Sequence, residues 1–239
     1  MKRAPLPGVD PTVYVNAIPL LVRNPSIIVV PLLTLVIGVL IGIALTPSNG
    51  AIGQMTAGLG AFIFFLIALF GVGAACVVAD DAWRHGRANF ERAWTETRRR
   101  GGEILTASIG VALLVTVGQY VTTFLGAIGL VLTALIVMFL IWALPAAAVG
   151  GIPGGAAIQV SIDRVRGAPL AAALATIVTL VLGFYVPAVL GAFIAGWVPT
   201  ISGVVLALVI ALIRAVMVGY IALVLSKTYS DEAFGRRRW

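Results

Sequence analysis

The charged residues of this chain are confined to a few segments, and this distribution constrains the fold more than any other feature. Of the 25 Asp, Glu, Lys and Arg residues, 24 fall in three segments or at the two ends. Six long stretches are therefore almost free of charge. Only Arg214 lies inside one of them, in the middle of the sixth.

The six stretches are long enough to cross a membrane. The 239-residue chain is 61% hydrophobic and 10% charged, whereas a soluble domain carries about 25% charged residues. A helix needs roughly 20 mainly apolar residues to span a bilayer. We therefore predict an all-α polytopic membrane protein, a single membrane domain over residues 1–239, with six transmembrane helices: Ile27–Leu45, Thr56–Ala79, Ile104–Leu125, Ile128–Val149, Leu170–Ala195 and Ile201–Ser226.

The basic residues indicate the topology. The three loops predicted on one side, Thr46–Met55, Gly126–Ala127 and Gly196–Thr200, contain no charged residue. The positive-inside rule then places both termini and the charged segments in the cytoplasm. It also explains the net charge of +7 without nucleic acid as a partner. The partner that this pattern predicts is the lipid bilayer, including anionic lipid headgroups near the basic flanks.

The chain is predicted to contain three copies of one unit, an interfacial amphipathic segment followed by two spans. The copies cover residues 1–79, 80–153 and 154–239. The first and third share Arg23-Asn24-Pro25-Ser26 and Arg166-Gly167-Ala168-Pro169 just before a span, where proline suits the first turn of a helix. The second copy has Arg100-Gly101-Gly102-Glu103 there instead.

The second cytoplasmic segment, Asp80–Glu103, has the pattern of an amphipathic helix. We predict one apolar face of Trp83, Gly86, Phe90, Trp94 and Thr97, with Arg87 and other charged residues on the remaining faces. Such a helix could dock a partner or anionic lipid through Trp83, Arg87, Phe90 and Trp94. It could equally lie in the membrane interface as part of the fold, with its Trp rings at headgroup depth.

Three motifs resemble a family. Leu21-Val22-Arg23-Asn24-Pro25-Ser26-Ile27, then Gly86-Arg87…Phe90…Ala93-Trp94, then Pro145-Ala146-Ala147-Ala148-Val149 with Val165-Arg166-Gly167, are similar to elements of a bacterial and archaeal group of six-span proteins. The group includes the membrane domain attached to some glycerophosphodiester phosphodiesterases. The resemblance implies a prokaryotic inner-membrane protein and a fold, not an activity. The chain departs from the group at Gly150-Gly151, where an acidic residue would be expected.

Arg214 is the candidate functional residue. It lies 13 residues after Ile201 and 13 before Lys227, about 20 Å from either end of its span. An arginine at that depth needs a partner or water. The neutral candidates are Gln119, Tyr120 and Tyr185, together with the carbonyls that Pro145 and Pro187 release four residues earlier, at Ile141 and Gly183. Arg214 either binds an anionic substrate in a polar cavity or ties its helix to neighbouring carbonyls.

Several kinds of catalytic or binding site are excluded because the sequence lacks the residues that they require. His85 is the only histidine, which excludes a histidine-rich metal site, and the run Gly150-Gly151-Ile152-Pro153-Gly154-Gly155 lacks the Lys-Ser/Thr of a phosphate loop. We predict no enzyme, no cofactor and no metal. The function predicted first is a transporter, channel or lipid-handling protein for an anionic or small polar substrate.

The alternative function is a non-transporting scaffold or accessory subunit of a membrane complex. Small residues recur every four positions, in span six at Gly203, Ala207, Ala211, Ala215 and Gly219 and in span five at Ala188, Ala192 and Gly196. Such stripes let helices approach closely in lipid. They indicate either internal packing or contacts in a homo-oligomer or with a membrane-complex partner.

Overall fold

The computed structural model describes residues 9–44, 51–198 and 202–235, and within them every regular element is helical. The predicted all-α fold is confirmed at this level. The elements are α1 Pro11–Arg23, α2 Ser26–Ala44, α3 Ala51–His85, α4 Phe90–Arg99, α5 Gly101–Thr122, η1 Thr123–Leu125, α6 Ala127–Leu140, α7 Ala143–Ala148, α8 Gly154–Gly167, α9 Pro169–Leu180, η2 Val181–Tyr185, α10 Val186–Trp197 and α11 Gly203–Gly235.

Five helical segments are long and apolar enough to cross a membrane, namely Ala57–His85, Gly101–Val121, Ile128–Ala148, Pro169–Trp197 and Gly203–Asp231. A sixth results if α1 and α2, which meet at 82°, are counted as one span. The helix that contains the second span begins before the predicted start at Thr56, because α3 already includes residues 51–55 of the predicted loop. Residues 46–50 and 199–200 of the predicted loops lie outside the described residues, as do Lys2, Arg3 and the three arginines 236–238.

The corner between α1 and α2 is built around Asn24. Pro25 disfavours helical dihedrals at the residue before it, and α1 ends at Arg23. The buried Asn24 side chain donates to the Leu20 carbonyl at 2.9 Å and accepts from the Ala88 N–H at 2.7 Å. A single side chain therefore fixes the turn of α1 into α2 and also holds the segment between α3 and α4.

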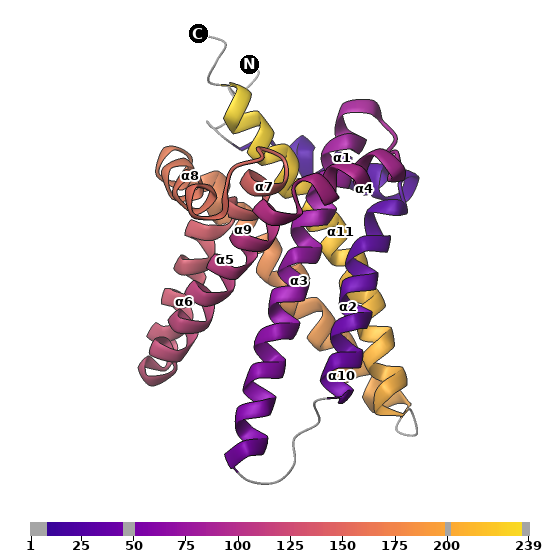
Figure 1. Ribbon diagram of the computed structural model, residues 1–239, viewed down its shortest axis with the longest axis vertical. Coiled ribbons are helices and arrows are strands. Elements are labelled where there is room, and N and C mark those ends of the chain that lie inside the picture. The colour runs from indigo at the N-terminus through magenta and orange to yellow at the C-terminus, as the bar shows by residue number, and fades with distance from the viewer. Residues whose placement is uncertain (1–8, 45–50, 199–201, 236–239) are drawn as a thin grey trace.

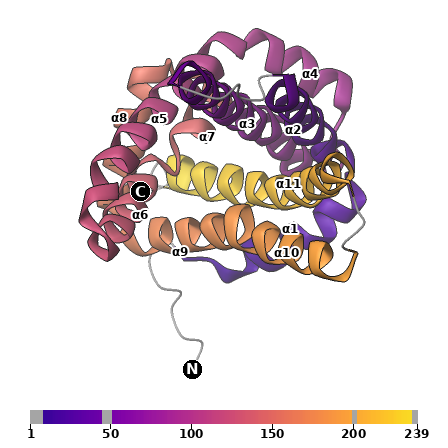
Figure 2. The ribbon, with the colours of Figure 1, turned by 90° about the horizontal axis from the view of Figure 1, so that it is seen from below.

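The helices run between two ends of different character (Figure 1). We call the end that carries α1, α4 and α8 the charged end, and the end where α10 gives way to α11 the far end. Seen from the far end, α11 lies between the α2–α3 pair and the α9–α10 helix, with α5 and α6 to one side (Figure 2). α11 contacts helices on both of its sides, so it is the central helix of the bundle.

The small-residue stripes behave differently in the two spans. Ala211 and Ala215 of α11 are buried beside Leu35 of α2, and Gly219 is buried where α11 meets α1 and α2. This part of the first stripe serves internal packing. The second stripe, Ala188, Ala192 and Gly196, is exposed along α10, so it makes no internal contact of that kind.

Side-chain hydrogen bonds fasten α11 to its neighbours at the charged end. Three donors outside α11 reach it: Trp83 Nε1 donates to the Leu223 carbonyl at 2.9 Å, Trp142 Nε1 to Thr228 Oγ1 at 3.1 Å and Arg164 Nη1 to the Tyr229 carbonyl at 2.9 Å. In the other direction, the Tyr220 hydroxyl of α11 donates to the Tyr14 carbonyl of α1 at 2.9 Å. The guanidinium of Arg164 also lies 3.7 Å from the centre of the Tyr229 ring, a cation–π contact. The charged end is thus held by directional bonds as well as by packing.

The predicted single helix over Asp80–Glu103 is wrong. α3 continues to His85, the chain turns at Gly86 with φ +73, and α4 begins at Phe90 after the N-cap Asn89. Glycine adopts this left-handed conformation without steric cost. α4 buries Ala93 and Thr97, and Trp83 and Gly86 do not share a face with Phe90 and Trp94.

Two neighbouring glycines at the start of α8 should respond oppositely to substitution. A Cβ added at Gly154 would lie 2.6 Å from the Thr106 carbonyl carbon and 2.7 Å from the Ala107 nitrogen of α5, whereas at Gly155 it would meet nothing within 4 Å. We expect Gly154→Ala to destabilise the protein by about 1–3 kcal/mol and Gly155→Ala to have little effect. Thermal unfolding in detergent measures both. Equal effects would show that α8 does not pack against the α5 backbone.

Candidate functional site

A cavity of about 420 Å³ lies within the bundle. Its walls come from α2, α3, α5, α6, α7, α9, η2 and α11. Most of its lining side chains are aliphatic or aromatic. Four are polar and uncharged, namely Thr34, Gln119, Thr133 and Thr179, and Arg214 is the one charged residue among the described residues that line it.

Arg214 lies deep in the membrane-spanning part of α11. It follows Gly203 by 11 residues and precedes Asp231 by 17 in a segment apolar enough to span a bilayer, or about 17 Å and 26 Å along the helix. Its Nε is buried and has no hydrogen-bond partner among the described residues. The cavity lining in the described part of the chain includes no acidic side chain, so nothing in the wall balances this charge.

The neutral polar groups that line the cavity differ in whether they have a partner. Thr34 donates to the Pro31 carbonyl at 2.9 Å, and Thr133 donates to the Gly129 carbonyl at 2.9 Å. Gln119 also has a polar partner. In contrast, the buried Thr179 hydroxyl finds no partner in the described part of the chain. Arg214 and Thr179 are therefore the two lining residues whose buried polar atoms are unsatisfied.

The regular α-helix is interrupted just before both prolines that were predicted to release a carbonyl, and both interruptions border the cavity. α6 stops at Leu140 and the chain turns before α7, which contains Pro145. Before Pro187, the helix widens into a π-helix over Val181–Tyr185, a local widening that is often found at functional sites. Ile141 and Gly183, the residues whose carbonyls the prolines release, both line the cavity. Arg214 Nε is bonded to neither carbonyl.

The structure brings together two of the four residues predicted to bind substrate. Arg214 and Gln119 line the cavity. Tyr120 and Tyr185 are 73% and 67% exposed and are not among its lining residues, so they lie on the outer surface of the bundle. Sequence reasoning missed Thr179, which lies in a mainly apolar helix where a threonine does not stand out.

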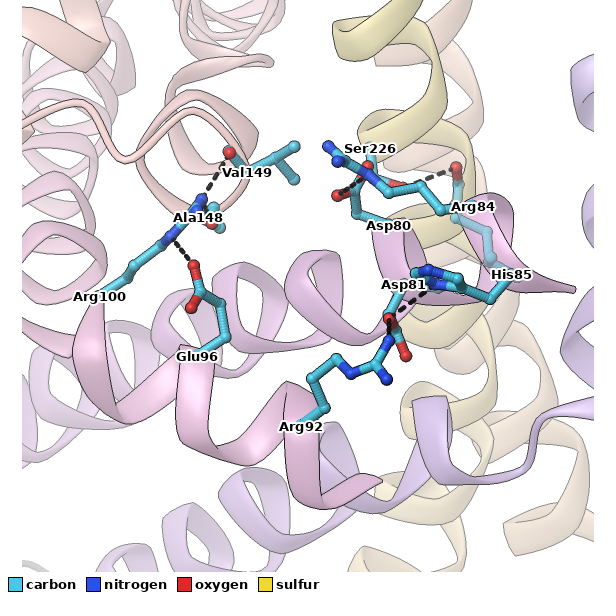
Figure 3. Close-up of polar contacts among 11 residues, drawn as sticks. Asp80, Asp81, Arg84, His85, Arg92, Glu96, Arg100, Ala148, Val149 and Ser226 are labelled. Carbon is cyan, nitrogen blue, oxygen red and sulfur yellow. Dashed lines mark hydrogen bonds and ion pairs between the residues drawn. The ribbon is translucent and has the colours of Figure 1, made fainter. Parts of the chain in front are cut away.

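The charged residues between α3 and α4 form a network that joins these helices (Figure 3). Arg84 pairs with Asp80 at 2.8 Å. Asp81 pairs with His85 at 3.0 Å and with Arg92 at 3.7 Å, and accepts the Asn89 N–H at 2.8 Å. Arg92 thus contacts α3 and not Glu96, which lies four residues later in its own helix. Asp81 therefore links the end of α3 to the start of α4.

Arg100 connects α4 with α7 (Figure 3). Its Nε contacts Glu96 at 2.5 Å, as that pair's spacing predicts, and its Nη1 donates to the Ala148 carbonyl at 2.7 Å and the Val149 carbonyl at 2.5 Å. A cation at these carbonyls satisfies the C-terminal end of a helix. The hydrogen bond from Arg99 to Glu96, helped by Arg100, keeps the pKa of Glu96 below its usual range. These groups are occupied by structural contacts.

The four residues predicted to face a partner are dispersed. The Trp83 indole donates to Leu223, and Arg87 lies in the turn between α3 and α4. Phe90 and Trp94 stack on each other, with ring centroids 6.3 Å apart, on an exposed face of α4. Only this last pair retains an aromatic surface that could meet lipid headgroups or another protein.

The side chains that commonly bind metal ions do not form a cluster in the described residues. In residues 9–44, 51–198 and 202–235, no group of three or more His, Cys, Asp or Glu side chains could hold a metal ion. The cavity around Arg214 is therefore the strongest candidate site in the described chain. Comparison with known proteins finds no matching family model, no matching curated protein and no matching solved structure.

Proposed function

We propose that this membrane protein binds an amphipathic anion in its central cavity, as a transporter or lipid-handling protein. The observation that carries the proposal is Arg214, the one charged side chain of the described lining, whose buried Nε is unpaired in an otherwise mainly apolar cavity. We infer binding rather than catalysis, because the polar groups of the described lining provide a counter-ion, an amide and hydroxyls but no acid–base pair.

The energetics of Arg214 support a ligand. An arginine at the centre of a membrane helix costs roughly 2.5–3.5 kcal/mol on insertion scales. An anion that enters the cavity would offset this cost through charge-assisted hydrogen bonds, which are among the strongest in proteins. The apolar walls, in turn, would contact an apolar part of the same ligand. A small inorganic anion would leave most of the cavity surface unused.

The proposed topology has six spans, with both termini and the charged end in the cytoplasm of a prokaryotic cell and the protein in its inner membrane. The basic residues of α4, α8 and the end of α11 all lie at one end of the bundle (Figure 1), which supports a single cytoplasmic side. The 82° corner between α1 and α2 supports α1 as an interfacial helix before a first span. The resemblance to six-span prokaryotic membrane proteins agrees with this topology.

The order of the helices supports the threefold repeat within this proposal. Each of the short helices α1, α4 and α8 precedes two long helical segments. The corner residues Asn24 and Ala168, which end α1 and α8, have closely similar dihedrals, with φ −129 and ψ 69 against φ −142 and ψ 63. Arg100, which ends α4, has φ −98 and ψ 10, as the different sequence there leads us to expect.

A scaffold is the second candidate function. The observation in its favour is the exposed small-residue stripe of α10, Ala188, Ala192 and Gly196, which would allow a second transmembrane helix to approach closely. A homo-oligomer or a membrane-complex partner would fill this role. Since a scaffold has no use for an unpaired cation in a cavity, Arg214 separates the two functions.

Binding of amphipathic anions to the protein in lipid nanodiscs tests the proposal. Radiolabelled dodecanoate and dodecyl phosphate serve as probes, so that either headgroup is detected. We expect Arg214→Ala to weaken binding about 10- to 100-fold, the range that hydrogen bonds to a charged group provide, and Arg214→Lys to restore part of it. Arg166→Ala, which removes an exposed arginine of α8, is the control.

Two results would contradict the proposed binding of an amphipathic anion. If neither probe binds, or if Arg214→Ala and Arg214→Lys leave binding unchanged while Ala lowers thermal stability, Arg214 is a structural residue and the scaffold function replaces the proposed one.

A further inference from the structure

The polar and apolar residues of the cavity are ordered along the helices. On three helices the polar lining residue lies nearest the far end, and the lining residues that follow toward the charged end are aliphatic. These series are Gln119, Val115 and Val111 on α5, Thr133, Val137 and Leu140 on α6, and Arg214, Val218, Ile221 and Leu225 on α11. Three independent helices thus give the cavity the same polarity, with a polar half toward the far end and an apolar half toward the charged end.

The remaining walls follow this order only in part, because Thr179 of α9 lies nearer the charged end than the apolar lining residues Leu180, Gly183 and Phe184. On α3, Phe64 and Phe65 lie toward the far end, and Leu69 and Val72 lie toward the charged end. Leu144 of α7 closes the apolar half, with the fully buried Trp142 beside it in the chain. Thr34 does not interrupt the apolar half, because its hydroxyl is bonded within its own helix.

The charge count limits the headgroup. One guanidinium balances one negative charge, and the described lining offers no second cation. A dianionic phosphate monoester would keep an unbalanced charge in a low-dielectric site, which is strongly unfavourable. The planar guanidinium matches a planar carboxylate through two parallel hydrogen bonds. A carboxylate therefore fits the polar half better than a dianion.

The volume limits the rest of the ligand. An apolar cavity of about 150 Å³ holds benzene, which has six heavy atoms, so a cavity of about 420 Å³ corresponds to roughly 17 heavy atoms. A two-chain phospholipid is far larger than this. A single-chain carboxylate of about 12 carbons has 12 carbon and two oxygen atoms, and so fits within this size.

We propose that the ligand is a single-chain aliphatic carboxylate, with its headgroup at Arg214 and its chain directed toward α7 and the charged end. This inference rests on the proposed function and adds the headgroup, the chain length and the direction of binding. Gln119 and Thr133 lie in the same half of the cavity as the headgroup, and Leu140, Leu144 and Leu225 surround the end of the chain.

The chain-length dependence of binding tests the direction. Val72→Phe adds four heavy atoms at the apolar half, so we expect affinity for dodecanoate to fall at least tenfold while affinity for octanoate changes less than twofold. Val117→Phe makes the same change at an exposed position of α5 that does not line the cavity, and both affinities should stay within twofold of the unmodified protein. Equal losses for octanoate and dodecanoate in Val72→Phe would overturn the proposed direction.

A second measurement does not depend on a folded variant. Dodecanoate with a photoactivatable diazirine at its terminal carbon should label the α3 segment around Val72 or the α7 segment around Leu144 in the unmodified protein. Labelling of the α5 segment around Gln119 instead would overturn the direction of binding. An excess of unlabelled dodecanoate must abolish the specific label.

Competition separates this inference from the function on which it rests. Dodecanoate should displace radiolabelled dodecanoate at least tenfold more effectively than dodecyl phosphate, dodecanol or acetate does. If dodecyl phosphate binds in an Arg214-dependent manner and dodecanoate does not, the carboxylate inference is wrong and the proposed function stands. If acetate competes as well as dodecanoate, the chain makes no contact and the inference is wrong. If no anion binds, both fail.

Discussion

Arg214→Met is expected to stabilise the ligand-free protein by about 2–3 kcal/mol while abolishing its binding of amphipathic anions. Methionine approximates the length of the arginine stem and removes a charge whose Nε is buried without a partner. The expected gain corresponds to removing a buried polar group that has no hydrogen-bond partner, which costs about 1–3 kcal/mol and more when the group is charged. Most substitutions at buried positions destabilise a protein, so a gain here would be diagnostic. Thermal unfolding in nanodiscs, with and without dodecanoate, measures both effects.

Arg214→Lys is the matched control, because it keeps the charge and removes only the planar group. It should bring no comparable stabilisation. A loss of stability in Arg214→Met, equal to or greater than that in Arg214→Lys, would show that the guanidinium ties α11 to its neighbours. In that case the guanidinium would be a structural group, and the described lining would offer no other cation for an anionic ligand.

Trp142→Ala is expected to destabilise the protein by about 3–5 kcal/mol, the usual cost of truncating a buried tryptophan. Trp142 is 0% exposed and lies at the break between α6 and α7. Its indole donates to Thr228 of α11, and its backbone N–H donates to the Ser161 hydroxyl of α8 at 3.1 Å. Removing the ring leaves a void and an unpaired Thr228 acceptor at the point where three helices meet. Unfolding by heat or by SDS in mixed micelles measures the loss.

Two further substitutions serve as comparisons for Trp142→Ala. Trp197→Ala removes a tryptophan that is 76% exposed at the end of α10 and should change stability little. Trp142→Phe keeps most of the ring and loses the indole N–H, so its effect should be intermediate. A Trp142→Ala protein as stable as Trp197→Ala would contradict the packing described for the charged end.

The sequence predicts the five spans that the structure supports, because their signal is composition over a long window. It predicts the helix start at Pro25 and the carbonyls released by Pro145 and Pro187 for a local reason, since proline lacks an N–H and suits the first turn of a helix. The break at Gly86 was missed. The residues around it have helical spacing, and only the tertiary contact of Asn24 with Ala88 shows why the chain turns there.

The candidate site is harder to predict than the spans. In a soluble helix the apolar face identifies the interior, but here the side toward lipid is as apolar as the side toward the cavity. Gln119 and Tyr120 are adjacent in sequence, and helical geometry separates them by about 100°, so one lines the cavity and the other faces outward. Arg214 was predictable because a charge is rare at that depth. Thr179 was not, because threonine is unremarkable in a membrane helix.

The hydrogen bonds that hold α11 near Leu223, Thr228 and Tyr229 also determine how the bundle can fluctuate. Each bond contributes about 1 kcal/mol, and the partners belong to separate helices, so α11 cannot slide at this end without releasing all of them together. No comparable clamp holds the first turns of α11 in the part of the chain described. The stretch of α11 around Arg214 is held instead by packing, as where Ala211 and Ala215 lie beside Leu35, so a small shift there does not require these bonds to break.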